Sequence, residues 1–245
     1  MSKSSDLFWK GVLKYISIGV VVFLFFYPAY LYRLIYPYIF AKPVAGKLQI
    51  SDKDFFSDVE NAQNIQIKSS EATFILSPKV KYAVTGKVAY VERYSGWWEK
   101  FAHGHDKSHT LYNYFSPMDL TLVYGPLANK EKYQYINFDH EYRAAKMTYS
   151  RAVITHEELI NYLNNYHIIP ANRRVKRGLD TIITDDTIYI EGYLVNVKAV
   201  EEPWFVLNTG LRHDQWHKEL YGGNYAPMCF ILYTTKLIIK HRVYE

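Results

Sequence analysis

The sequence predicts an α+β protein with an N-terminal transmembrane helix and a mainly antiparallel β domain, open or barrel-like, with two or three short helices. Three observations predict this class. An uncharged apolar run lies near the N-terminus, several later segments alternate polar and apolar residues, and the chain contains 24 tyrosines. Tyrosine fits a half-buried pleated surface, so its abundance favours a sheet over a helical bundle.

The apolar run spans eighteen uncharged residues from Tyr15 to Tyr32. A helix of that length is about 27 Å long, close to the hydrocarbon core of a bilayer at about 30 Å. Trp9, Tyr15 and Tyr32 suit the interfacial belts, and Arg33 can extend to the headgroups. A cleaved signal peptide is less favoured because no small-residue cleavage pattern closes the run. A buried core helix this uniformly apolar would be unusual.

These observations divide the chain into a tail and anchor (residues 1–42), a linker (43–50) and a β-rich domain (51–245). Six basic residues face one acidic residue in positions 1–47, whereas positions 48–245 are neutral overall, with 23 of each sign. The excess charge therefore flanks the anchor, and we expect the lipid bilayer and other envelope proteins as partners, with no nucleic acid. A short tail before a long domain favours a single-pass protein of the bacterial inner membrane with its domain outside the cytoplasm.

Strands dominate the expected domain. Residues 80–90 alternate with period two, residues 119–124 end at a Gly-Pro pair, and 133–138 and 141–149 form a pair. A further long strand is expected over 187–198, a short one over 204–208, and a closing strand over 229–239.

Short helices are expected at three places. Ser51 is placed to cap a helix reaching about Asn61, and Thr155 with Glu158 matches a capping box. The second helix is expected to run toward Pro170, so that His167 lies at its end. Asn172 caps a third helix, with Val175 and Leu179 facing inward.

Three segments resemble a family of uncharacterised bacterial proteins. They are SPMDL with YGPL at 116–127, NYHIIPAN at 165–172, and DTIYIEGYLV at 186–195. Their order and spacing are those of the family, over residues 80–235, while the His-rich insert at 103–109 departs from it. The resemblance implies a compact bacterial domain and no particular reaction.

Two histidine groups have metal-like spacing. His103, His105 and His109 share a glycine-containing loop, and His213 and His217 are four residues apart. A polar surface loop and a solvated helix face explain them more simply, so we expect no bound metal. The chain contains no phosphate-binding glycine loop and no dinucleotide fingerprint, which leaves no cofactor to expect. Cys229 is the only cysteine, so no intrachain disulfide can form.

The candidate catalytic residues are His167, Asp119 and Asn165. His167 is expected to be a structural histidine that orders a turn, or else a general base paired with Asp119 or Asn165. The function that these observations favour is a membrane-anchored interaction or assembly subunit of a bacterial envelope. The alternative is a membrane-tethered hydrolase, metal-dependent or not.

Overall fold

The computed structural model describes residues 41–245, apart from 61, 71, 95–106, 142 and 212–228. The chain divides into two compact units, Met1–Ala41 and Lys42–Glu245. The expected anchor, with Trp9, Tyr15, Tyr32 and Arg33, lies outside the described residues. Within the described part of the chain, no helix has the length and apolar character that crossing a bilayer requires.

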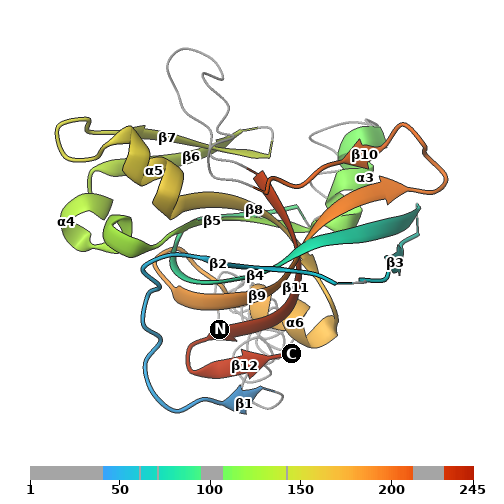
Figure 1. The fold of residues 1–245 in the computed structure, drawn as a ribbon, viewed down its shortest axis with the longest axis horizontal. Helices are drawn as coiled ribbons and strands as arrows, with labels where there is room; N and C mark the ends of the chain where they lie inside the picture. Colours follow the sequence, from blue (N-terminus) through green and yellow to red (C-terminus); the bar gives the residue numbers. More distant parts are fainter. Residues whose placement is uncertain (1–40, 61, 71, 95–106, 142, 212–228) are drawn as a thin grey trace, which may run out of the picture. The chain divides into compact units, whose positions relative to one another are not determined.

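The second unit is built mainly of strands (Figure 1). Among the described residues, ten strands form one sheet: β1 (Lys42–Pro43), β2 (Phe55–Asp58), β3 (Ile65–Lys68), β4 (Thr73–Arg93), β5 (Met118–Val123), β8 (Leu163–Pro170), β9 (Thr187–Ala199), β10 (Val206–Leu207), β11 (Cys229–Ile239) and β12 (Arg242–Tyr244). A separate hairpin consists of β6 (Ile136–Glu141) and β7 (Ala144–Tyr149). The class predicted from the sequence, a β-rich α+β fold, is confirmed.

Most strand pairs are antiparallel, in the order β1-β12-β11-β8-β5-β4-β9-β10, with β2 and β3 also on β4. The pair β8–β11 is parallel. Strand β9 pairs with β4 along its length and also with β11, so the sheet is strongly curled. Gly192 allows the close approach of β9 and β11, because a Cβ there would lie 2.0 Å from the carbonyl oxygen of Tyr233.

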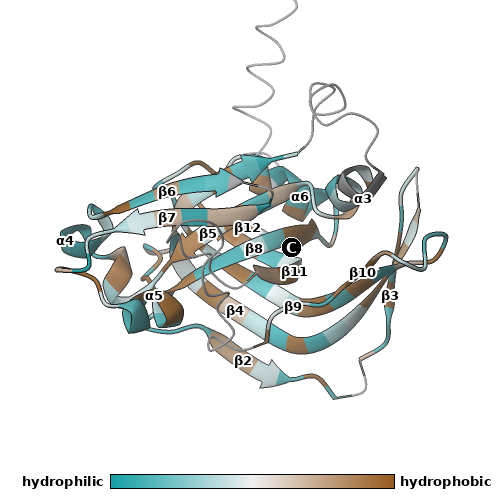
Figure 2. Ribbon diagram, turned by 90° about the horizontal axis from the view of Figure 1, so that it is seen from above, coloured by the Kyte–Doolittle hydropathy of each residue, from teal (hydrophilic) through white to brown (hydrophobic). Residues whose placement is uncertain are grey.

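Most strands lie where the residue pattern placed them. The expected segments 80–90, 119–124 and 187–198 fall within or overlap β4, β5 and β9, and β11 has the predicted bounds. Bands of polar and apolar residues alternate along β4 and β9 (Figure 2), as expected for strands with differently exposed faces. The expected strand over 204–208 is reduced to the two residues of β10.

The helices are α3 (Lys107–Phe115), the 3-10 turn η1 (Gly125–Ala128), α4 (Lys130–Tyr133), α5 (His156–Tyr162) and α6 (Arg173–Leu179). The predicted capping box is present in α5, where Thr155 accepts from the backbone N–H of Glu158 and the Glu158 side chain accepts from Thr155. The predicted cap of α6 is also present, because Asn172 Oδ1 accepts from the N–H groups of Arg174 and Val175.

Two helix predictions are wrong. No helix begins at Ser51. Its hydroxyl accepts a hydrogen bond from the Thr85 N–H, and residues 55–58 pair with β4 as β2. The helix after Thr155 ends at Tyr162, because Leu163 is already extended and begins β8. His167 therefore lies within a strand and not at a helix end, because residues 163–170 pair with β5 and β11.

The two faces of the curled sheet pack against different groups of residues. On one side, apolar clusters pack beneath α3 and beneath α5 with the β6–β7 hairpin. On the other side, the hydroxyls of Tyr82 and Tyr124 both donate to Asp54 Oδ2, at 2.9 and 3.0 Å. Tyr166 OH is 2.6 Å from Tyr82 OH, and Asn164 Nδ2 donates to Tyr124 OH at 2.9 Å. This network ties the segment before β2 to the sheet through Asp54, and it leaves the buried Asn164 Oδ1 without a hydrogen-bond partner among the described residues.

Candidate functional site

The register of β5 and β8 sets two candidate residues side by side. Asp119 pairs with His167 across the two strands, and Thr121 pairs with Asn165 two positions away. Residues two apart in a strand share a face, so all four side chains project to the same side of the sheet. His167 Nδ1 is 2.8 Å from Asp119 Oδ1, and both residues are buried.

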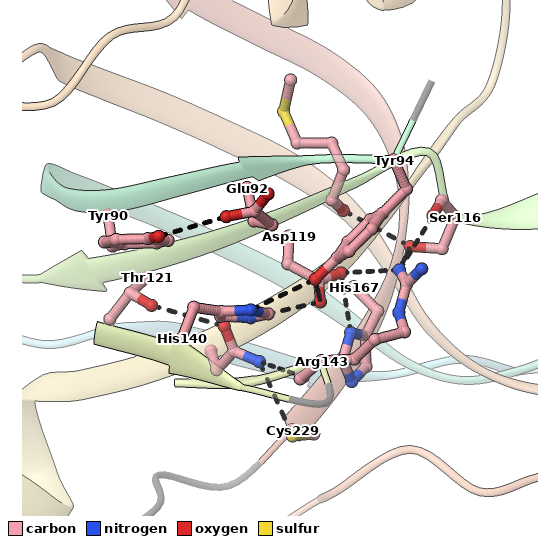
Figure 3. Close-up of polar contacts among 12 residues, drawn as sticks. Tyr90, Glu92, Tyr94, Ser116, Asp119, Thr121, His140, Arg143, His167 and Cys229 are labelled. Atoms are coloured by element: carbon pink, nitrogen blue, oxygen red, sulfur yellow. Dashed lines mark hydrogen bonds and ion pairs between the residues drawn. The ribbon is translucent and has the colours of Figure 1, made fainter. Parts of the chain in front are cut away.

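Asp119 is the centre of a converging polar network (Figure 3). Its Oδ1 accepts from His167 Nδ1 and from Arg143 Nη2, each at 2.8 Å. Its Oδ2 accepts from the Tyr94 hydroxyl at 3.0 Å and lies 3.5 Å from His140 Nε2. Polar groups from the loop after β4, the β6–β7 turn, β6 and β8 thus surround a single carboxylate that is 1% exposed.

Arg143 reaches this network from the turn between β6 and β7. Its backbone has φ 65°, a left-handed conformation that a bulky side chain rarely adopts. The guanidinium lies over the rings of Tyr94 and Tyr112, 3.8 and 4.1 Å from their centroids. It also donates to the carbonyl oxygen of Ser116 at 2.8 Å and to Asn113 Oδ1 at 2.5 Å. A strained backbone held by so many side-chain contacts is typical of functional sites.

The opposite charges in the network stabilise each other's ionised forms. Burial alone would raise the pKa of Asp119, but His167 and Arg143 lower it, and the net result is a pKa well below the usual range. Burial alone would lower the pKa of His167, but the Asp119 carboxylate raises it to about 9. His167 is therefore an imidazolium at neutral pH, paired with an ionised carboxylate.

Cys229 stands next to this pair at the start of β11. It is opposite Asn165 in the parallel register, so its side chain shares the face of Asn165 and His167. Asn165 Nδ2 donates to Cys229 Sγ at 3.6 Å. Burial raises the pKa of the Cys229 thiol, but the charge and hydrogen bond of His167 and the amide of Asn165 outweigh it, so the pKa is lowered. The residue is partly accessible to solvent.

The three catalytic candidates therefore have different outcomes. His167 and Asp119 form a direct pair. Asn165 does not bond to that pair in the described structure. It contacts Cys229, the Thr121 hydroxyl at 3.4 Å and the backbone oxygen of Arg143 at 3.3 Å.

The described residues do not test the metal candidates. His103, His105, His213 and His217 lie outside the described residues, and His109 is described only as part of the backbone of α3. Among the residues whose placement is described, no group of three or more potential ligands has a metal-binding arrangement.

Sequence reasoning did not identify Arg143, Tyr94, His140 or Cys229 as parts of this site. The first three come from a turn, a loop and a hairpin strand, and no spacing in the sequence links them. Cys229 joins the site only through the parallel pairing of β11 with β8, which no local pattern in the sequence indicates.

No protein-family model, curated protein or solved structure matches this chain. The resemblance to an uncharacterised bacterial family stays a prediction.

Proposed function

We propose that the chain is a membrane-tethered hydrolase in which Cys229 is the nucleophile. His167 is the general acid and base, and the Asp119 carboxylate orients His167 and stabilises its protonated form. The observation that carries this proposal is the contiguous series Cys229–His167–Asp119 on one face of three neighbouring strands. A nucleophile beside a base that a third group orients is the arrangement that covalent catalysis requires.

Charge in the site favours the thiolate. Arg143 contributes a guanidinium cation, and the pKa of His167 of about 9 makes its imidazole a cation at neutral pH. Asp119 is the carboxylate that both cations contact. The two cations therefore exceed the single carboxylate by one positive charge. A Cys229 thiolate beside the imidazolium balances this charge without a bound ligand.

The chemistry follows from these protonation states. The Cys229 thiolate attacks the carbonyl carbon of an ester or thioester, and the bond to the leaving group breaks as His167 donates its proton to that group. Neutral His167 then takes a proton from water, the hydroxide attacks the acyl-cysteine, and the acid leaves with the thiolate restored. His167 Nδ1 is held by Asp119, so Nε2 performs both transfers.

The test is acylation by an activated ester, p-nitrophenyl acetate, with the full chain in detergent. We expect a burst of one equivalent of nitrophenol and an acetyl group on Cys229, located by mass spectrometry of peptides. His167→Asn should slow acylation by about a hundredfold, the usual lower range for a lost proton-transfer group.

The matched control is His241→Asn, which removes a histidine from the β11–β12 turn, far along the strand from the site. It should leave the burst unchanged. Equal burst rates for the wild type, His167→Asn and Cys229→Ser would contradict the proposed function.

A second candidate is the membrane-anchored interaction or assembly subunit. The observation that favours it is an apolar surface around β10, the strand that ends the sheet. Trp204 is 57% exposed and Val206 is 53% exposed. Exposed aromatic and aliphatic residues at a sheet edge suit a protein partner. Trp204→Ser with Val206→Ser should remove a protein that co-purifies from membranes, whereas unchanged co-purification would exclude this surface.

A further inference from the structure

We infer that the side-chain amide of Asn165 is the oxyanion donor of the Cys229 reaction, so that the site acts on carbonyl electrophiles such as esters and thioesters. The inference deepens the proposed function and rests on it. Asn165 is fully buried in β8, between Thr121 of β5 and Cys229 of β11 (Figure 3). Its amide therefore contacts the sulfur from which the attack on a carbonyl carbon begins.

Three contacts fix the orientation of this amide. The nitrogen Nδ2 donates to the backbone oxygen of Arg143 at 3.3 Å. A carbonyl oxygen can only accept, so the nitrogen of the amide, and not its oxygen, must face Arg143. At the other end of the amide, Oδ1 accepts from the Thr121 hydroxyl at 3.4 Å. The third contact joins Nδ2 to Cys229 Sγ at 3.6 Å, so an N–H group is directed at the nucleophile before any substrate binds.

The proposed reaction moves negative charge from sulfur to oxygen. When the Cys229 thiolate attacks, a C–S bond forms and the π electron pair of the carbonyl group moves onto its oxygen. That oxygen is bonded to the carbon that the sulfur has joined, so its charge develops beside the same N–H group. When the intermediate collapses, the electron pair returns to the carbonyl group and the leaving group departs with the proton of His167. Asn165 gains and loses no proton in either step.

The amide of Asn165 should accelerate this reaction because its hydrogen bond becomes stronger along the way. Only interactions that are stronger in the transition state than in the ground state raise the rate. The contact to sulfur is long, at 3.6 Å, and sulfur is a weak acceptor. A hydrogen bond from an amide to an oxyanion is shorter and stronger because the acceptor atom is charged. A buried amide that is already oriented also has nothing to rearrange when the charge appears.

The neighbouring donors have other partners or other tasks. Arg143 Nη2 donates to the Asp119 carboxylate at 2.8 Å. The Nδ1 atom of His167 is held by Asp119, which assigns the Nε2 atom of His167 to the leaving group. Asn165, by contrast, is directed at the sulfur and takes no part in proton transfer. The geometry of the described site thus favours Asn165 as the group that stabilises the oxyanion.

The experiment compares two reagents that react with the same thiolate, with the full chain in detergent. The reaction with p-nitrophenyl acetate passes through an oxyanion, whereas iodoacetamide loses iodide from a saturated carbon and forms no oxyanion. Both reactions require the thiolate, so the ratio of their rates does not depend on the ionised fraction of Cys229. Asn165→Ala should lower the ratio of acylation to alkylation by about 100- to 1,000-fold, the usual effect of one oxyanion donor.

Further variants separate this role from a structural one. Thr121→Val keeps Asn165 but removes the hydroxyl that orients its amide, and it should lower the ratio about fivefold, as expected for the loss of one neutral hydrogen bond. Thr121→Ser keeps a hydroxyl and should keep the wild-type ratio. The matched control is Asn137→Ala, which removes an exposed asparagine from β6 and should leave the ratio unchanged. Melting temperatures show whether each variant is folded.

An unchanged ratio in folded Asn165→Ala would overturn the inference, while acylation of the wild type would still support the proposed function. If Asn165→Ala does not fold, the two variants of Thr121 decide, and equal ratios for Thr121→Val, Thr121→Ser and the wild type would overturn the inference. A wild-type chain that iodoacetamide alkylates but p-nitrophenyl acetate does not acylate would refute the proposed function, and the inference with it.

Discussion

Replacing Asp119 with asparagine removes the carboxylate that accepts from His167, Arg143 and Tyr94. The variant keeps the shape of the side chain and leaves the Arg143 guanidinium buried without its anion. Breaking a buried ion pair in this way costs about 3–5 kcal/mol of unfolding free energy. For a domain of this size the melting temperature should fall by about 6–20 °C.

The pH dependence of this loss gives a sharper test. The pKa of His167 is raised to about 9 from an unfolded value of 6.5, so its contribution to stability is complete below pH 6.5 and disappears as the pH rises through 9. The contribution amounts to about 3 kcal/mol. The pKa of Asp119 is lowered, so its contribution is present at neutral pH and disappears only in acid. The wild type should therefore lose stability between pH 6.5 and 9, and Asp119→Asn should not.

The assay is thermal unfolding of the detergent-solubilised full chain at pH 6, 7, 8, 9 and 10, for the wild type and Asp119→Asn. The control is Asp58→Asn, which changes an exposed carboxylate on β2 and should alter the unfolding free energy by less than about 0.5 kcal/mol. A constant gap between the wild type and Asp119→Asn across the whole range would refute the proposed ionic pair of Asp119 with His167.

Two further variants test the surroundings of the site. Arg143→Lys keeps the charge but loses the planar fork that contacts Asp119 and Ser116, so we expect a loss of about 2 kcal/mol in denaturant unfolding, whereas Arg174→Lys on the surface should be neutral. Asn172→Ala removes the cap of α6 and should cost about 1 kcal/mol, seen as a drop of about 2–4 °C in melting temperature; an unchanged value would mean that the cap contributes nothing.

Predictions from the sequence were most accurate for elements whose structure depends on neighbouring residues alone. Thr155 and Glu158 satisfy each other's backbone donors within one turn, and Asn172 caps the next helix in the same local way. Long strands such as β11 were also predictable, because alternation over many residues leaves little ambiguity.

The site was less predictable because it depends on partners that are distant in the chain. Residues 163–170 directly follow the predicted helix, and their strand is formed by pairing with β5 and β11. That pairing places His167 beside Asp119, 48 residues away, and beside Cys229. Arg143 enters from a turn with a left-handed backbone, a conformation that nothing in its neighbouring residues indicates.

The most direct measurement of the central claim is the rate at which iodoacetamide alkylates Cys229 as a function of pH. Only the thiolate reacts, so the rate reports its population. We predict an inflection below the ordinary thiol pKa of about 8.5, with a shift toward higher pH in His167→Asn because the imidazolium that stabilises the thiolate is gone. An inflection at or above the ordinary value in the wild type, unchanged in His167→Asn, would contradict a thiolate–imidazolium pair at this site.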